Sequence, residues 1–112
     1  MIPSIVVHRW RTLNDEALSE EAIRARFPSE KYRVSLYRYP SKARFDGEMR
    51  QATCHVLSGV CRYLFKAGVE ATVGAGDVAE LPAGCFTLEV LGDDDLVLVL
   101  CWALPIAPNG RQ

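Results

Sequence analysis

Short apolar runs, each broken by a turn signal of glycine, proline or aspartate, occupy most of the chain. Strands separated by turns at intervals of about 8–12 residues are typical of an all-β sandwich or barrel. The run at 43–45 is expected to be short, because the Asp-Gly pair that follows it favours a turn. The strand candidates cover residues 5–10, 32–39, 43–45, 51–57, 60–65, 69–73, 77–81, 86–91 and 96–103.

One segment near the N-terminus has a helical pattern instead. Ser19 is a suitable N-cap, and the two glutamates after it suit the positive end of a helix dipole. Ile23 and Phe27 lie four residues apart and would share one face. Pro28 ends the segment, because proline cannot continue the hydrogen-bond ladder. We therefore expect one short helix between Ser19 and Pro28.

Composition narrows the class of protein. The 112 residues suit one domain, and 49% apolar with 24% charged residues is ordinary for a globular chain. The formal net charge of −1 gives no reason to expect nucleic acid or an anionic membrane as a partner. The N-terminus lacks a cationic start for a signal peptide, and the longest apolar stretch, 96–106, is about half a membrane span. The four cysteines form no C-x-x-C pair, so we expect buried, reduced packing thiols and a cytoplasmic location.

Basic residues gather in one part of the sequence. Six of the thirteen lysines and arginines fall between positions 31 and 50. Two interpretations stay open. They form the solvated face of two strands, or one or two arginines bind the carboxylate or phosphate of a ligand.

Two glycine-punctuated segments resemble the motifs of the cupin superfamily. Residues 76–84 have the glycine, the five-residue spacer and the Pro-x-Gly of the second motif, and residues 56–59 have the Val-Leu-x-Gly turn that ends the first. The resemblance implies a double-stranded β-helix, or jelly-roll barrel, over residues 31–104. Residues 1–30 would pack on it as a strand and a short helix, and 105–112 would be a frayed tail, all within one domain.

The resemblance also assigns the metal-ligand positions of the family, and the sequence has no histidine at any of them. Transition metals in such sites want imidazoles together with a carboxylate. Under the shorter of two spacings, Asp46, Glu48 and Thr87 would offer only a weak site for a hard cation. We therefore expect neither a metal nor another cofactor. The metal-ligand positions of the family fall on Ala52, on a pair of residues before it, and on Thr87 after it. The pair is Phe45 and Gly47, or Asp46 and Glu48 with the shorter spacing.

The inward face of the strand at 86–91 has two possible registers. The register of the family turns Thr87 and Glu89 inward, whereas burial of apolar residues turns them outward. If Glu89 faces an apolar interior, its pKa rises and it becomes a candidate general acid or base. The alternative is a solvated glutamate on the outer face.

A candidate ligand pocket follows from alternation along the strands. The family register turns Cys54 inward and His55 outward, to a surface or an interface. Either face of the strand at 32–39 presents an aromatic residue and an arginine, which suits a small, partly apolar anion, although a strand packed on one side and solvated on the other fits equally. The predicted pocket residues are Tyr37, Arg38, Phe45, Ala52, Cys54 and Thr87, with Cys54 and Cys85 near the mouth as packing thiols.

Two functions remain open. One is a metal-independent protein that binds a small organic ligand, neutral or anionic, in the barrel. The alternative is a metal-free isomerase, epimerase, cyclase or dehydratase, in which Glu89 acts with Tyr37 or Arg38. A purely structural domain would be favoured if its own side chains fill the barrel. The resemblance also implies a homodimer that buries the apolar strand 96–102 on both faces.

Overall fold

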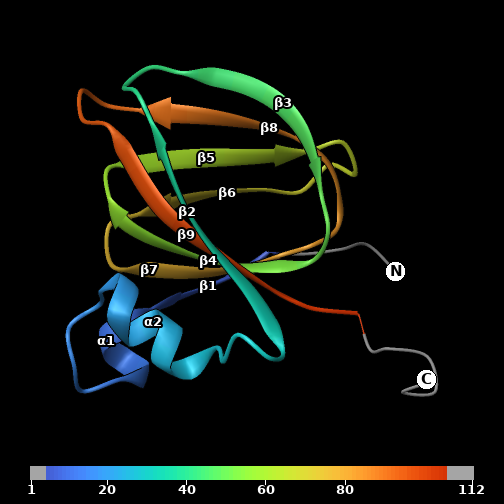
Figure 1. The fold of residues 1–112 in the computed structure, drawn as a ribbon. Helices are drawn as coiled ribbons and strands as arrows, with labels where there is room; N and C mark the ends of the chain where they lie inside the picture. Colours follow the sequence, from blue (N-terminus) through green and yellow to red (C-terminus); the bar gives the residue numbers. More distant parts are fainter. Residues whose placement is uncertain (1–4, 106–112) are drawn as a thin grey trace.

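The computed structural model describes residues 5–105, in which nine strands form two antiparallel sheets that face each other (Figure 1). One sheet has the strand order β1-β7-β4-β9-β2 and the other β3-β8-β5-β6. This is the predicted all-β jelly roll with a helical segment near the N-terminus. The elements are β1 (Val6–Arg9), α1 (Trp10–Leu13), α2 (Glu20–Arg26), β2 (Tyr32–Tyr39), β3 (Arg44–Met49), β4 (Ala52–Ser58), β5 (Val60–Phe65), β6 (Glu70–Gly74), β7 (Asp77–Leu81), β8 (Gly84–Leu91) and β9 (Leu96–Ala103).

The helical segment has the caps that the sequence predicts. The hydroxyl oxygen of Ser19 accepts a hydrogen bond from the N–H of Ala22 at 3.1 Å, and α2 begins at the next residue. The short helix α1 was not predicted. It starts at Trp10, the last residue of the predicted first strand, and its buried indole anchors it.

Strand β3 corrects one expectation. The Asp-Gly pair at 46–47 was predicted to break the strand, but β3 continues through it and pairs with β8 along its whole length. Gly47 lies opposite Phe86, and a Cβ atom at Gly47 would stand 3.0 Å from Cζ of that ring. Here the glycine allows close approach of an aromatic ring within a strand, which is a second common use of glycine in sheets.

The glycine at the end of the 56–59 motif is a true turn residue. Gly59 has a φ of 83°, and a Cβ there would lie 2.5 Å from the carbonyl oxygen of Asp95. No other residue type fits both the backbone conformation and the space. The motif therefore marks the tight connection between β4 and β5.

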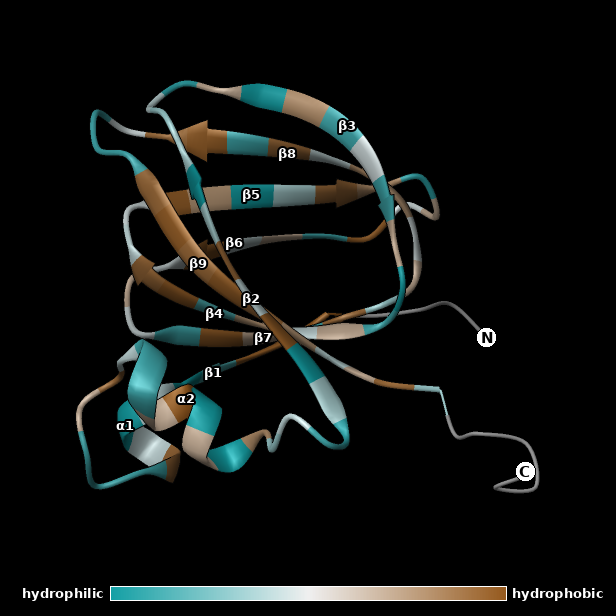
Figure 2. Cartoon of the chain, viewed as in Figure 1, coloured by the Kyte–Doolittle hydropathy of each residue, from teal (hydrophilic) through white to brown (hydrophobic). Residues whose placement is uncertain are grey.

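The central strands of the five-stranded sheet are largely buried on both faces. Its inner face packs in the barrel with Cys54, Val56 and Leu98, and its outer face lies under α1 and α2 with Ile23 and Val99. Figure 2 shows β9 hydrophobic along most of its length, as expected for a strand covered on both sides.

This packing changes the argument for a dimer. The apolar strand at 96–102 was expected to need a second subunit over its outer face, but helices of the same chain cover it. The homodimer remains a prediction.

Two further expectations concern the C-terminal tail and membrane-spanning segments. Pro105 is the one residue of the expected tail 105–112 that the structure describes. Among the described helices, none has the length and apolar character needed to cross a bilayer.

Candidate functional site

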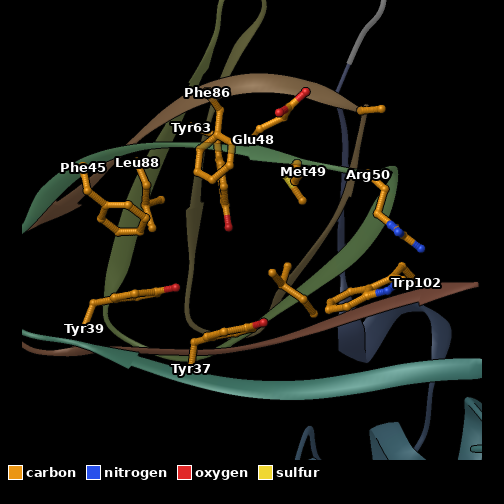
Figure 3. A pocket seen from close by; sticks show the side chains of 12 residues that line it. Tyr37, Tyr39, Phe45, Glu48, Met49, Arg50, Tyr63, Phe86, Leu88 and Trp102 are labelled. Atoms are coloured by element: carbon orange, nitrogen blue, oxygen red, sulfur yellow. The ribbon is translucent and has the colours of Figure 1, made fainter.

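A cavity of about 680 Å³ lies between the two sheets at one end of the barrel and is partly open to solvent. Its volume falls in the usual range for sites that bind small molecules, roughly 300–1,000 Å³. Aromatic and aliphatic side chains from both sheets make most of its wall (Figure 3). The lining residues are Tyr37, Tyr39, Phe45, Glu48, Met49, Arg50, Tyr63, Ala83, Phe86, Leu88, Leu100 and Trp102.

Three tyrosines supply polar groups to this apolar wall. Tyr37 and Tyr39 lie along one side with nearly parallel rings, 6.1 Å apart at their centroids, and Tyr63 descends from the opposite sheet. Figure 3 shows the three hydroxyls directed into the space between the sheets. Burial raises the pKa of Tyr39 and of Tyr63, so both stay protonated at neutral pH. The cavity therefore offers O–H groups that can donate or accept a hydrogen bond.

The mouth of the cavity is charged. Glu48 and Arg50, which flank the end of β3, stand at the rim with Trp102 of β9. In Figure 3 the Arg50 guanidinium points down toward Trp102, whereas the Glu48 carboxylate points up, away from it. A groove of about 460 Å³ continues outward from the mouth, shares Tyr37, Arg50 and Trp102 with the cavity, and adds Arg33 to its wall.

Four predicted pocket residues lie on the inner side of the barrel or beside its mouth. Tyr37 and Phe45 line the cavity. Cys54 lies deeper, fully buried, with its Sγ 3.9 Å from the Tyr63 hydroxyl oxygen. Ala52 is buried, beside a separate shallow depression that also touches Arg50. The structure thus brings two of the predicted residues into the cavity wall and two just beyond it.

The prediction that Arg38 faces the pocket is wrong. Of the two faces of β2, the one with Tyr37 and Tyr39 turns inward. Arg38 is exposed on the other face, where its Nε lies 3.8 Å from a carboxylate oxygen of Asp95. Alternation alone defined the two faces of the strand but not which of them is inside.

The inward register for Thr87 and Glu89 is also wrong. Leu88 and Val90, on the opposite face of β8, are buried in the barrel core, so burial of apolar residues decides the register. The Glu89 carboxylate accepts a hydrogen bond from Arg62 Nε at 2.9 Å and also pairs with Arg44 on the outer face. A carboxylate held by two arginines outside the barrel is not placed to exchange protons with a ligand in the cavity.

His55 faces away from the barrel as predicted, yet it does not reach the surface. Its side chain is 1% exposed and lies edge-on to the rings of Trp10 and Phe27 beneath the helices. Burial lowers the pKa of His55 to about 4, because the charged imidazolium would lose its hydration there. This histidine is a packed, neutral residue of the helix-covered layer.

The cysteines follow the expected behaviour with one exception. All four are free, and burial raises the pKa of Cys61 and of Cys101 to about 12, so neither thiol ionises at neutral pH. Cys54 is buried below the mouth and its pKa is also raised by burial. Cys85 was expected to be buried but is exposed.

The residues at the metal-ligand positions do not fit a metal. Phe45 and Ala52 have no donor atoms, and the Phe86 ring fills the space that a side chain at position 47 would need. Thr87 and Asp46 hydrogen bond to each other at 2.6 Å and are turned away from the cavity. Within residues 5–105, no three His, Cys, Asp or Glu side chains come together in a way that could hold a metal ion.

Sequence reasoning missed much of the cavity wall. Phe86 belongs to the register of its strand that burial of apolar residues favours. Tyr63 was within reach of prediction, because it shares one face of its strand with Cys61 and Phe65 and aromatic residues favour interiors. Arg33, Arg50 and Trp102 carried no such signal. They come together because the end of β3, the start of β2 and the end of β9 meet at the mouth.

Comparison with known proteins supports the barrel. Residues 31–92 match the family described as the EutQ-like cupin domain. The EutQ protein of Clostridium difficile superposes with a TM-score of 0.54 at 13% identity, over 69% of this chain and 59% of its own, so the chain spans about three fifths of that protein. Protein NMB1881 of Neisseria meningitidis gives 0.57 at 13% identity, over 80% of this chain and 100% of its own.

A third structure is ToxT of Vibrio cholerae, bound to (E)-4-(8-methylnaphthalen-1-yl)but-3-enoic acid. It superposes with a TM-score of 0.53 at 12% identity, over 66% of this chain and 31% of its own. At these identities the superpositions establish the fold alone. No curated protein sequence matches the chain. Because the family match covers more than half of the sequence and the barrel has the same fold, this chain belongs to the family of EutQ-like cupin domains.

Proposed function

We propose that this cupin binds a small organic molecule with an apolar, aromatic body inside its barrel, without a metal. The observation that carries the proposal is the cavity of about 680 Å³, which the side chains of the barrel leave unfilled. A purely structural domain would close this space, since protein interiors are otherwise packed almost as densely as organic crystals.

The wall suits an aromatic guest. Phe45 and Phe86 meet edge to face with centroids 6.3 Å apart, and Phe86 lies 5.6 Å from the Tyr63 ring. Aromatic rings at such separations accept a further flat ring by stacking or edge contact. The tyrosine hydroxyls add a small number of directional polar contacts, which is the usual composition of a binding site.

Binding is favoured over proton-transfer catalysis. An isomerase or dehydratase of this kind needs at least two convergent titratable groups next to its substrate. Glu89 lies outside the barrel, Glu48 stands at the exposed rim, and half-buried Tyr39 and buried Tyr63 hold their protons at neutral pH. These groups provide recognition rather than an acid and base pair.

A neighbour in fold supports the class of ligand. ToxT, which shares this fold over 66% of the chain, has been determined bound to a naphthyl-butenoic acid. We carry over only the general point that a protein with this fold binds a small organic molecule. A cytoplasmic location and a homodimer are part of the same proposal and rest on the cysteines and on family resemblance.

A thermal-shift screen tests the proposal. Benzoate, cinnamate, 2-naphthoate and their amides would be compared with divalent metals, all against protein pre-treated with a chelator. A ligand present at one hundred times its Kd adds about 2.7 kcal/mol to the free energy of unfolding. Stabilisation by aromatic compounds and not by metals is expected, whereas strong stabilisation by a transition metal would contradict metal-free binding.

A pair of variants locates the binding. Leu100→Trp places an indole into the cavity and is expected to abolish the ligand-induced shift. Leu36→Trp is the matched control, because Leu36 lies 42% exposed on the neighbouring strand and outside the cavity. Equal ligand shifts in both variants would place the ligand elsewhere.

A further inference from the structure

The arginines of the described chain divide into two groups. Most of them pair with a carboxylate, whereas three residues between 5 and 105 form no ion pair with any described side chain: Arg11, Arg33 and Arg50. Arg11 lies in α1, away from the cavity. The other two line the same groove at the mouth. Two arginines that form no ion pair within residues 5–105 therefore stand together at the mouth of the cavity, where a ligand would enter.

Strand pairing explains why Arg33 stands there. It lies opposite Trp102 in the β2–β9 ladder, on the face of β2 that also carries Ser35 and Tyr37. The inner face of β2 thus begins with a cation at the mouth and continues with hydroxyl-bearing and aromatic residues into the cavity. Arg50 reaches the same groove from the connection between β3 and β4.

The net charge of the residues at the mouth indicates the charge of the ligand that would bind there. Arg33 and Arg50 contribute two positive charges, and Glu48 at the rim contributes one negative charge. The remaining single positive charge matches a monoanion better than a phosphate dianion. A guanidinium presents paired N–H groups that fit the two oxygens of a carboxylate.

The lining of the cavity determines which end of the ligand lies at the mouth. Among the described residues of the cavity wall, Arg50 is the one cation, and the wall beyond it is aromatic, aliphatic and hydroxylic. A charged group deeper in the barrel would lose its hydration without a counter-ion, which is costly. The anionic end of a ligand therefore stays at the mouth, and the apolar end lies among Phe45, Phe86 and Leu88.

We propose that the ligand is an amphipathic monocarboxylate, held at the mouth by Arg33 and Arg50, with its aromatic body in the cavity. This inference rests on the proposed function and adds the charge, the orientation and the two anchoring residues. A hydroxyl or carbonyl on the far end of the ligand meets the tyrosine hydroxyls inside.

The test compares 2-naphthoate with 2-naphthamide, which has the same shape and no charge. Binding is followed by intrinsic fluorescence, since one of the two tryptophans, Trp102, lines the cavity and the other, Trp10, is buried in α1 against the outer face of the sheet. Trp102→Phe identifies which tryptophan reports. Wild-type protein is expected to bind the acid at least tenfold more tightly than the amide, because hydrogen bonds to charged groups are the stronger class.

Three variants assign the anchors. Arg33→Gln and Arg50→Gln are each expected to weaken 2-naphthoate binding about tenfold and to weaken 2-naphthamide binding clearly less. Arg11→Gln, which removes the remaining unpaired arginine of the described chain, is the matched control and should leave both affinities unchanged. Circular dichroism checks that each variant is folded.

The outcomes separate the inference from the proposed function. Equal wild-type affinities for acid and amide, or an acid preference that survives both substitutions, would overturn the arginine anchor while binding itself stands. Failure of both compounds to bind the wild-type protein, together with a negative thermal-shift screen, would overturn the proposed function and the anchor with it.

Discussion

The two faces of the five-stranded sheet show how one layer of strands serves two purposes. On the outer face, α1 and α2 cover the middle of the sheet, and Ile23, His55 and Val99 are each 1% exposed or less. On the inner face, the deep end is equally closed, with Cys54 and Leu98 at 0%, but toward the mouth the packing gives way to the cavity. The covered face and the deep end hold the fold together, and the mouth end is left free for a ligand.

The difference is visible along a single strand. Leu98 and Leu100 lie on the same inner face of β9, two residues apart, yet Leu98 is fully buried and Leu100 borders the cavity. Stability and binding are therefore expected to respond to different substitutions.

Leu98→Ala is expected to lower the free energy of unfolding by about 2–5 kcal/mol, because it opens a new void in a filled core. Leu100→Ala should cost clearly less, since it only enlarges a space that already exists. Urea denaturation of the two variants measures the contrast. Equal losses would show that the cavity is closed in solution.

Acid is expected to weaken the helix-covered face. His55 has a pKa of about 4 in the folded protein against about 6.5 when unfolded, so the unfolded chain binds more protons below pH 6.5. Its contribution is fully present above pH 6.5 and is lost as the pH falls toward 4, by up to about 3 kcal/mol.

Urea denaturation between pH 7 and pH 4 measures this effect as the difference between wild type and His55→Phe. The variant should lose this part of the acid sensitivity while carboxylates continue to titrate in both proteins. His8→Gln is the control, because His8 lies on β1 outside the helix-covered cluster. If His55→Phe keeps the full pH dependence, another group is responsible.

Added volume should also distinguish the two faces. Ala22→Val overfills the helix-covered layer and is expected to cost about 1–3 kcal/mol. Gly47→Ala pushes on the Phe86 ring, which has room to move into the cavity, so the stability loss should stay below about 1 kcal/mol. The same shift narrows the site, and 2-naphthoate affinity should fall. Unchanged affinity in Gly47→Ala would place the ligand away from Phe86.

The smallest effect is expected at Glu89. Glu89→Gln removes the charge that pairs with Arg44 and Arg62, whose side chains are 63% and 43% exposed, so stability should fall by no more than about 1 kcal/mol. Ligand affinity is expected to stay the same, because this side chain lies on the outer face. A large loss of binding would place Glu89 in contact with the ligand.

Parts of the fold were predictable because local rules decide them. The Ser19 cap, the end of α2 before Pro28 and the Gly59 turn depend on backbone geometry within a few residues. The continuation of β3 through Gly47 could not be predicted in this way, because the ring that requires the glycine comes from β8. The turn propensity of Asp46-Gly47 predicts a break in the strand, whereas packing against Phe86 allows the strand to continue. The packing determines the structure there.

The candidate site was predictable only in part for the same reason. Alternation separated Tyr37 from Arg38 and His55 from Cys54 correctly, yet it did not say which member of each pair meets a ligand, water or a helix. Phe45 and Tyr37 were placed in the wall, whereas Arg33, Arg50 and Trp102 are brought together by strands far apart in sequence.

The sequence by itself determined the strand rhythm, the caps and turns, and the lack of histidine at the metal-ligand positions, since each depends on residue type and short-range spacing. The tertiary structure alone decided three things: that β8 turns Leu88 inward and Glu89 outward, that helices rather than water cover His55, and that two arginines without ion pairs in the described chain meet at the mouth. These follow from how the two sheets and the helices pack, and packing between distant segments is not written in any local pattern.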